Sequence, residues 1–175
     1  VWKSDWVGIY NFKRFFKGYN FWSTLWNTVS LSLYFLLATL PLPVILGLMF
    51  NNIRNGLFKK GVQMITYAPN FISLVIIVGM LKIFMMPNTG LVNVIIRMLG
   101  GNGDYDIFGK PTAFRHLYVW SGVWQTLGWN SIIYVAALAG ISPDLYEAAK
   151  IDGATRLQRI WHLEIPGILP TVTTM

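Results

Sequence analysis

The feature that most limits the fold of this chain is the spacing of its charged residues. Lys, Arg, Asp and Glu make up 12% of the residues, and they are absent from three long stretches, 18–53, 61–81 and 116–143. Each stretch can hold the ~20 apolar residues with which an α-helix crosses the hydrocarbon core of a bilayer. A helix at the surface of a soluble core normally carries charged residues on its wet face. The pattern therefore predicts an all-α membrane protein.

The formal net charge of +7 does not indicate a nucleic-acid-binding protein. Such a protein needs a basic stripe on an exposed face. Here the basic residues lie mostly between the apolar stretches, where membrane proteins carry them. The absence of cysteine excludes disulfides and thiolate metal sites. His116 and His162 have no second histidine or carboxylate at ligand spacing, so the sequence predicts no metal site and no cofactor.

Hydropathy and breakers divide the chain into spans and connecting segments. Spans are predicted at 21–50, 62–86 and 116–141, with an aromatic and basic interfacial segment at 1–20. Pro41 and Pro43 should kink or loosen the first span, and Pro69 lies near the start of the second. Residues 51–61 are predicted to form a polar loop, residues 91–99 a short interfacial helix, and residues 100–112 another loop.

Loop charge gives an orientation. The 51–61 segment holds Arg54, Lys59 and Lys60 and no acid, which favours the cytoplasmic side. Three spans then place segments 1–20 and 100–112 outside the cell and everything after Ile141 inside. The basic residues of 1–20 argue against this orientation when charge alone is considered.

Capping signals after the third span predict a helix, a glycine turn and a second helix within 142–170. Ser142 can cap the first helix, with Pro143 at its first position and an acid next, and Gly153 ends it. Residues 155–158 match a capping box, and the second helix is expected to end before Pro166.

The first of these helices mixes small apolar residues with charged ones. Ala148, Ala149 and Ile151 permit close approach to a partner, while Glu147 and Lys150 can fix its register. The residues suit either docking in a groove of another protein or resting on the membrane as an amphipathic linker, and physical reasoning from the sequence leaves both open.

Two segments carry a resemblance to a known family: 147–154, with the sequence EAAKIDGA, and 165–170, with the sequence IPGILP. They resemble the EAA loop of binding-protein-dependent ABC importer permeases, in which a glycine follows the second alanine by four residues and an Ile-x-Leu-Pro pattern comes near the close. Asn27-Thr28 and 124–140 resemble the sugar-importer branch. Segments 71–73 and 87–93 are similar to permeases for complex saccharides and oligosaccharides.

The resemblance implies a fold, a function and partners. The fold would be a polytopic helical bundle, the transmembrane domain of an ABC importer, with 1–175 as one permease domain. Such permeases usually have about six spans, so one span before and two after this chain are expected. The expected function is a permease subunit for a saccharide, an oligosaccharide or polysaccharide fragment, in the membrane of a prokaryotic cell. A cytoplasmic ATPase dimer, a second permease and an extracytoplasmic solute-binding protein are the implied partners.

The resemblance also implies which residues couple the permease to the ATPase and on which side of the membrane they lie. In the family the EAA loop is a cytoplasmic coupling helix seated in a cleft of the ATPase, which agrees with the orientation from loop charge and places 1–20 outside. The coupling residues are then Glu147, Ala148, Ala149, Asp152, Gly153 and Ala154. The chain has no phosphate-binding glycine loop, nucleophile elbow or pair of catalytic acids, so it is not expected to be an enzyme. The third span, which leads directly into this loop, is hypothesised to act as its lever.

Polar and aromatic side chains inside the spans are candidates for the substrate path, because sugars bind by aromatic stacking and by amide or hydroxyl hydrogen bonds. The candidates are Asn27, Asn70, Trp124, Trp129, Asn130 and Tyr134. The alternative is that such groups hydrogen-bond neighbouring helices. Lys82 lies near the outer end of its span and is expected to extend to the headgroups.

Two other functions stay open at this stage. An EAA-loop permease could carry an amino acid, a peptide or an inorganic ion, and a non-transport scaffold or small channel could use the loop for another partner. The sequence does not identify the saccharide, the ATPase or the second permease.

Overall fold

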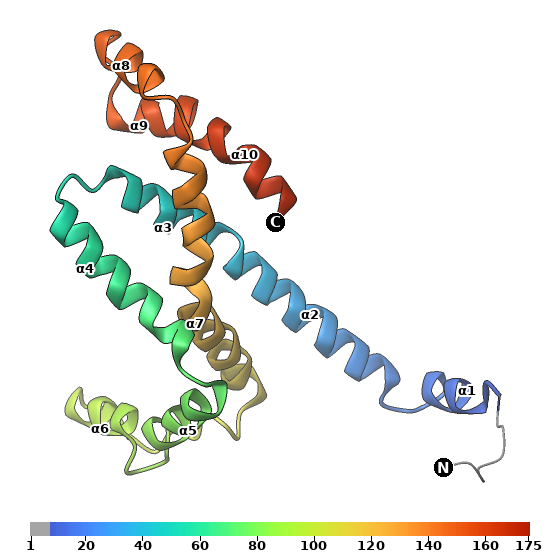
Figure 1. Cartoon of the computed structure of the whole chain (residues 1–175). Helices are drawn as coiled ribbons and strands as arrows, with labels where there is room; N and C mark the ends of the chain where they lie inside the picture. The colour runs from blue at the N-terminus through green and yellow to red at the C-terminus, as the bar shows by residue number, and fades with distance from the viewer. Residues whose placement is uncertain (1–7) are drawn as a thin grey trace.

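The computed structural model describes residues 8–175, and within that range every regular element is a helix (Figure 1). The predicted all-α fold is confirmed for the described part of the chain. The elements are α1 (Tyr10–Phe16), α2 (Phe21–Thr39), α3 (Pro41–Asn52), α4 (Gly56–Tyr67), the 3₁₀ turn η1 (Ala68–Phe71), α5 (Leu74–Phe84), α6 (Leu91–Met98), α7 (Pro111–Ala139), α8 (Pro143–Ile151), α9 (Arg156–Arg159), the π-helical turn η2 (Ile160–Glu164) and α10 (Ile165–Thr174).

The first apolar stretch forms one long run of two helices. Together α2 and α3 cover Phe21–Asn52, 32 residues with a mean hydropathy of 2.2, long and apolar enough to cross a membrane. Pro41 begins α3, where a proline costs no helical hydrogen bond. The preceding Leu40 keeps helical backbone angles, so the prolines loosen the run without ending it.

The second apolar stretch is broken. Helix α4 with η1 and helix α5 pass the length and hydropathy test only as a pair, because the chain bends by 97° between them. Ile72 and Ser73 have extended backbone at the bend. Such a break exposes backbone groups that must find partners in a membrane. The Gln125 amide Nε2 of α7 meets one of them by donating to the Ile72 carbonyl at 3.0 Å.

The loop predicted at 51–61 is shorter than expected, and the prediction is wrong for residues 51–52, which end α3, and for residues 56–61, which begin α4. Helix α4 begins at Gly56 because the side chain of Asn55 caps it, accepting from the backbone N–H of Leu57 at 3.0 Å and of Phe58 at 3.2 Å. The basic residues Lys59 and Lys60 therefore lie on the first turns of a helix.

Helix α6 matches the short helix predicted at 91–99, and the loop after it lasts until α7 begins at Pro111. Asn93 is 1% exposed and organises this region. Its side chain donates to the carbonyls of Met86 (3.1 Å) and Tyr105 (3.2 Å) and accepts from the Tyr105 N–H (3.0 Å). One buried amide thus joins both ends of the segment 86–105.

Helix α7 is the central element of the fold. It packs against α2, α3, α4, η1 and α10, and Figure 1 shows α5 and α6 near its first end and α8 and α9 beyond its last. Glycines allow two of these contacts. A Cβ at Gly47 of α3 would lie 2.9 Å from the Tyr134 Cβ, and one at Gly128 would overlap the Thr66 backbone carbonyl of α4.

Beyond α7 the chain turns by 71° into α8. The predicted caps are confirmed: Ser142 accepts from the Asp144 N–H, Gly153 has φ +73°, and Thr155 and Gln158 form both hydrogen bonds of a capping box. The first helix ends at Ile151, just before the left-handed glycine.

The predicted end of the second helix before Pro166 is wrong, since helical structure continues to Thr174. The helix widens at η2, where the Ile165 N–H donates to the Ile160 carbonyl five residues back. This change of register precedes Pro166, which has no N–H to donate and lies in the first turn of α10, where a proline is tolerated.

Candidate coupling and substrate-path sites

The six predicted coupling residues lie together on α8 and the turn after it. Five of them, from Ala148 to Ala154, line a hollow between α8 and α9, together with Gln158, Arg159 and His162. The sixth, Glu147, is exposed. Asp144 in the first turn and Lys150 in the last turn of α8 both complement the helix dipole. The segment is therefore a well-capped short helix with a mostly exposed surface.

Helix α8 is held to the rest of the molecule by few contacts. None of its residues, 143–151, is buried, and α8 joins α7 only through residues 140–142. Its half-buried Tyr146 is the exception, because the phenol oxygen accepts from the Asn51 amide Nδ2 at 3.2 Å. Burial raises the pKa of the Tyr146 hydroxyl above 10.0, and the hydrogen bond from Asn51 acts against that shift.

That hydrogen bond belongs to a cluster that the sequence did not reveal. Glu164 of η2 is 2% exposed, and its carboxylate accepts from two neighbouring amides at the end of α3. Asn51 donates to Oε1 at 3.0 Å and Asn52 to Oε2 at 3.1 Å. The pairs are separated by 113 and 112 positions in the chain, so no local pattern could have found them.

The six substrate-path candidates lie in several places along α7 and its neighbours. Asn27 is at the first end of α7, where its Oδ1 accepts from the Arg115 guanidinium at 2.7 Å. Next to it, the Tyr34 hydroxyl accepts from the Trp120 Nε1 at 3.0 Å and lies 2.9 Å from the His116 Nδ1. Arg115, His116 and Trp120 were not among the candidates, although all three are polar or aromatic groups at the start of the third predicted span.

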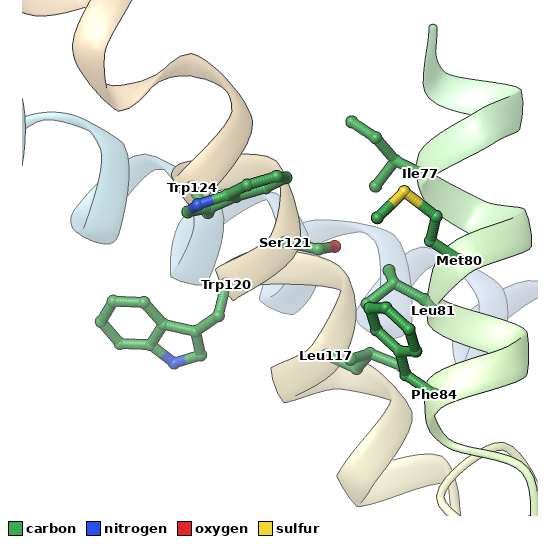
Figure 2. A pocket seen from close by; sticks show the side chains of 8 residues that line it. All are labelled: Ile77, Met80, Leu81, Phe84, Leu117, Trp120, Ser121 and Trp124. Carbon is green, nitrogen blue, oxygen red and sulfur yellow. The ribbon is translucent and has the colours of Figure 1, made fainter. Parts of the chain in front are cut away.

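Trp124 lines an apolar cavity of about 330 Å³ between α5 and α7. Figure 2 shows Ile77, Met80, Leu81 and Phe84 on the α5 side, while the Trp120 ring points away from α5. Ser121 is the polar residue of the lining. The wall suits hydrocarbon, such as a neighbouring apolar helix or a lipid chain, better than a sugar with its many hydroxyls.

The remaining candidates form two groups, one beside the bend in the second apolar stretch and one near the junction of α2 and α3. Trp129 makes an edge-to-face contact with Phe71, with 5.7 Å between ring centroids, and Asn70 is the neighbouring half-buried residue of η1. Asn130 and the buried Tyr134 line a second cavity, of about 210 Å³, together with Thr39 near the junction of α2 and α3. The structure thus places Trp129 against Phe71, the residue that follows Asn70, and brings Asn130 together with Tyr134, while Asn27 and Trp124 lie apart.

Comparison with known proteins gives consistent results. The profile of a family described as "Binding-protein-dependent transport system inner membrane component" matches residues 16–175. The chain is 37% identical to protein LplB of Bacillus subtilis, over 99% of this chain and 54% of that protein. It is 38% identical to the polygalacturonan/rhamnogalacturonan transport system permease protein YteP of the same organism, over 98% of this chain and 53% of that protein.

Solved structures agree in fold. A bacterial ABC transporter involved in the import of the acidic polysaccharide alginate matches with a TM-score of 0.94 and 38% identity, over 99% of this chain and 60% of that chain. The bacterial alginate transporter in complex with an alginate pentasaccharide-bound periplasmic protein matches with a TM-score of 0.91, over 95% and 57%. The chain spans about half the length of the curated relatives it matches.

Proposed function

Because the chain belongs to the family of binding-protein-dependent transport system inner membrane components, we propose that it is part of the permease subunit of an ABC importer for a saccharide. The family match over residues 16–175 carries the proposal. The relatives named for polygalacturonan, rhamnogalacturonan and alginate support an oligosaccharide or polysaccharide fragment as the solute. The cell membrane of a prokaryote is the corresponding location.

The geometry supports a division of labour along α7. The exposed helix α8 beyond one end of α7 serves as the coupling helix and docks, through Glu147 and the hollow beside it, on a cytoplasmic ATPase. The ATPase dimer supplies hydrolysis, a second permease completes the pathway, and an extracytoplasmic binding protein delivers the saccharide. Because α7 runs without interruption from Pro111 to Ala139, motion of α8 is carried along the whole helix.

The solute path follows the polar and aromatic groups beside α7, from the bend between η1 and α5 to the junction of α2 and α3. Trp129 and Phe71 offer aromatic faces, and Asn70, Asn130 and Tyr134 offer amide and hydroxyl groups. Discontinuous helices often form solute sites near the middle of a bilayer. The break at Ile72–Ser73, held by Gln125, gives such a discontinuity next to Phe71 and Trp129.

A relative named as an sn-glycerol-3-phosphate transport system permease, UgpA of Agrobacterium fabrum, is 29% identical over 96% of this chain and favours a second candidate solute class. The deciding experiment purifies the tagged full-length protein from its native host in mild detergent and identifies co-purifying proteins by mass spectrometry. Recovery of a P-loop ATPase, a second EAA-loop permease and an extracytoplasmic binding protein supports the importer.

Titration of that binding protein with neutral and acidic oligosaccharides and with small phosphorylated polyols then separates the two solute classes. Saccharide binding supports the proposal, and binding of the polyol alone replaces the saccharide by the second class. Failure to recover any of the three partners, under conditions that preserve a control importer, contradicts the importer assignment.

Loss of transport-coupled ATPase activity in a Glu147→Ala, Gly153→Ala double variant would support the coupling role. Unchanged coupling would contradict it. A Leu157→Ala variant is the matched control, because Leu157 is exposed on α9 outside the coupling residues.

A further inference from the structure

The stability of its own helix does not explain why the carboxylate of Glu164 is buried. A carboxylate removed from water is costly unless hydrogen bonds replace the lost hydration. Glu164 also lies against the last turn of α3, Asn51 and Asn52, where the helix dipole disfavours negative charge. Two amide donors offset this cost, so the buried placement of the Glu164 carboxylate depends on its hydrogen bonds to α3.

Asn51 links this carboxylate to α8. Its Nδ2 donates to the Glu164 Oε1 at 3.0 Å and to the Tyr146 hydroxyl at 3.2 Å, and an amide nitrogen has two hydrogens for these two bonds. Asn52 donates to the Glu164 Oε2 and also to the Leu48 carbonyl of its own helix, at 2.9 Å. The end of α3 is thereby bonded to α8 on one side and to η2 on the other.

These bonds matter for α8 because little else fixes it. Residues 143–151 contain no buried side chain, and the connection to α7 is a three-residue turn at a 71° bend. One hydrogen bond, from Asn51 to Tyr146, joins α8 directly to α3, and without it α8 could rotate about that turn. With it, a displacement of α8 is passed on to the end of the first apolar helix pair.

We propose that Glu164 is a positioning residue that, through Asn51 and Asn52, latches the coupling helix α8 to the end of α3. The inference rests on the proposed function and adds to it a second route for coupling. Motion that enters at α8 passes to α7 through the chain and to α3 through the latch. The latch is defined by Asn51, Asn52, Tyr146 and Glu164.

The test reverses the direction of one hydrogen bond. In Glu164→Gln an amide faces the Asn52 amide, so two donors meet, and in Asn52→Asp two carboxylates meet. In the double variant, the amide nitrogen introduced at position 164 can donate to the carboxylate introduced at position 52, while the amide oxygen at position 164 still accepts from Asn51. A double-mutant cycle therefore measures the coupling between positions 52 and 164.

The variants are made in the full-length permease within the assembled transporter. The measured quantity is ATP hydrolysis stimulated by the solute-loaded binding protein, divided by basal hydrolysis, for each assembled complex. We expect each single variant to lower this ratio about fivefold or more and the double variant to restore it to within about twofold of wild type. Thr173→Val is the control, because among residues 8–175 the Thr173 hydroxyl bonds only to the Pro170 carbonyl of its own helix, at 2.9 Å.

A second readout reports the position of α8 directly. Spin labels at Met49 of α3 and Leu145 of α8, which are both well exposed, give the distance distribution between the helices. We expect a narrow distribution in wild type and in the double variant, and a broad one in each single variant. Residues 1–175 contain no cysteine that would compete for the labels.

The outcomes separate the latch from the function on which it rests. Single variants that lose yield but keep the wild-type ratio and a narrow distance distribution would reduce the cluster to a structural role and overturn the latch. A double variant that recovers neither readout would overturn it as well. If wild type shows no stimulation by any binding protein, the importer assignment fails, and the distance distributions alone then decide whether α8 is latched.

Discussion

Replacing Gly128 by alanine tests the closest approach of α7 to α4. A Cβ at this position would overlap the backbone carbonyl of Thr66 and lie 3.0 Å from the Tyr67 Cδ1. Because the obstructing atoms are backbone, no change of rotamer relieves the overlap, and α4 has to move away from α7. Overpacking of this kind costs about 1–3 kcal/mol.

Gly61→Ala is the matched control for that variant. Gly61 lies inside α4 and has no atom within 4 Å of an added Cβ, so the new methyl group meets open space. Alanine is favoured over glycine in a helix interior by about 1 kcal/mol. We expect Gly61→Ala to be neutral or stabilising, and the two variants to differ by about 2–4 kcal/mol in the free energy of unfolding.

Thermal unfolding of the full-length protein in one detergent, followed by the loss of helical circular dichroism, measures the difference. For a full-length protein about twice as long as this chain, as its relatives are, about 1 kcal/mol moves Tm by roughly 1–2 °C, so the two variants should melt on the order of 5 °C apart. Equal melting temperatures would refute the reasoning, because they would mean that Gly128 has as much room as Gly61 and that α4 does not contact α7 there.

Four further outcomes are expected. Gln125→Leu removes the donor to the Ile72 carbonyl and should cost about 1–3 kcal/mol, seen as faster hydrogen exchange at the start of α5; unchanged exchange would contradict the bond. Gly153→Ala should lower the free energy of unfolding by about 1–2 kcal/mol, because the φ of residue 153 is +73°, although an added Cβ would meet open space. Gly153→Asn should lower it less. Equal melting temperatures of the two variants would count against a left-handed turn. Asn93→Leu leaves three backbone partners of a buried amide unpaired and should lose about 2 kcal/mol or more, with exchange rising across residues 86–105 rather than elsewhere. The raised pKa of Tyr146 predicts a contribution to stability that is fully present below pH 10.0 and is lost as pH rises through the raised pKa. Tyr146→Phe should therefore reduce the slope of the unfolding free energy against pH in that range. An unchanged slope would refute this prediction.

Signals within a few residues predicted local structure well. Ser142, Gly153 and the box at 155–158 predicted both ends of the first helix and the start of the second, because caps depend on neighbouring backbone alone. The rule that a helix ends before proline failed at Pro166, since η2 changes the hydrogen-bond register just ahead of it. Nothing in 160–164 signals a π-helical turn in advance.

Features that depend on distant residues could not be read from the sequence. The bend at Ile72–Ser73 lies in a continuous apolar stretch, where hydropathy gives no hint of a break, and its partner Gln125 is 53 positions away. Asn51 and Asn52 fall in a segment that composition predicts to be a loop, so their pairing with Glu164 was hidden. The substrate-path candidates were chosen by residue type, which cannot tell that Asn27 is already bonded to Arg115.

The position of the α4 crossing on α7 has a mechanical consequence. Gly128 is off centre: at a rise of about 1.5 Å per residue it lies about 16 Å from the Ala139 end and about 26 Å from the Pro111 end. A rigid rod turning about an off-centre fulcrum moves its longer arm farther and in the opposite direction. With Gly128 as the fulcrum, a displacement imposed at the Ala139 end would reappear enlarged by roughly 1.6-fold at the Pro111 end and by roughly 1.2-fold at Arg115 and His116. In the proposed coupling, α7 acts as a lever with arms of unequal length, and moving the glycine along the sequence would change the ratio of the two arms.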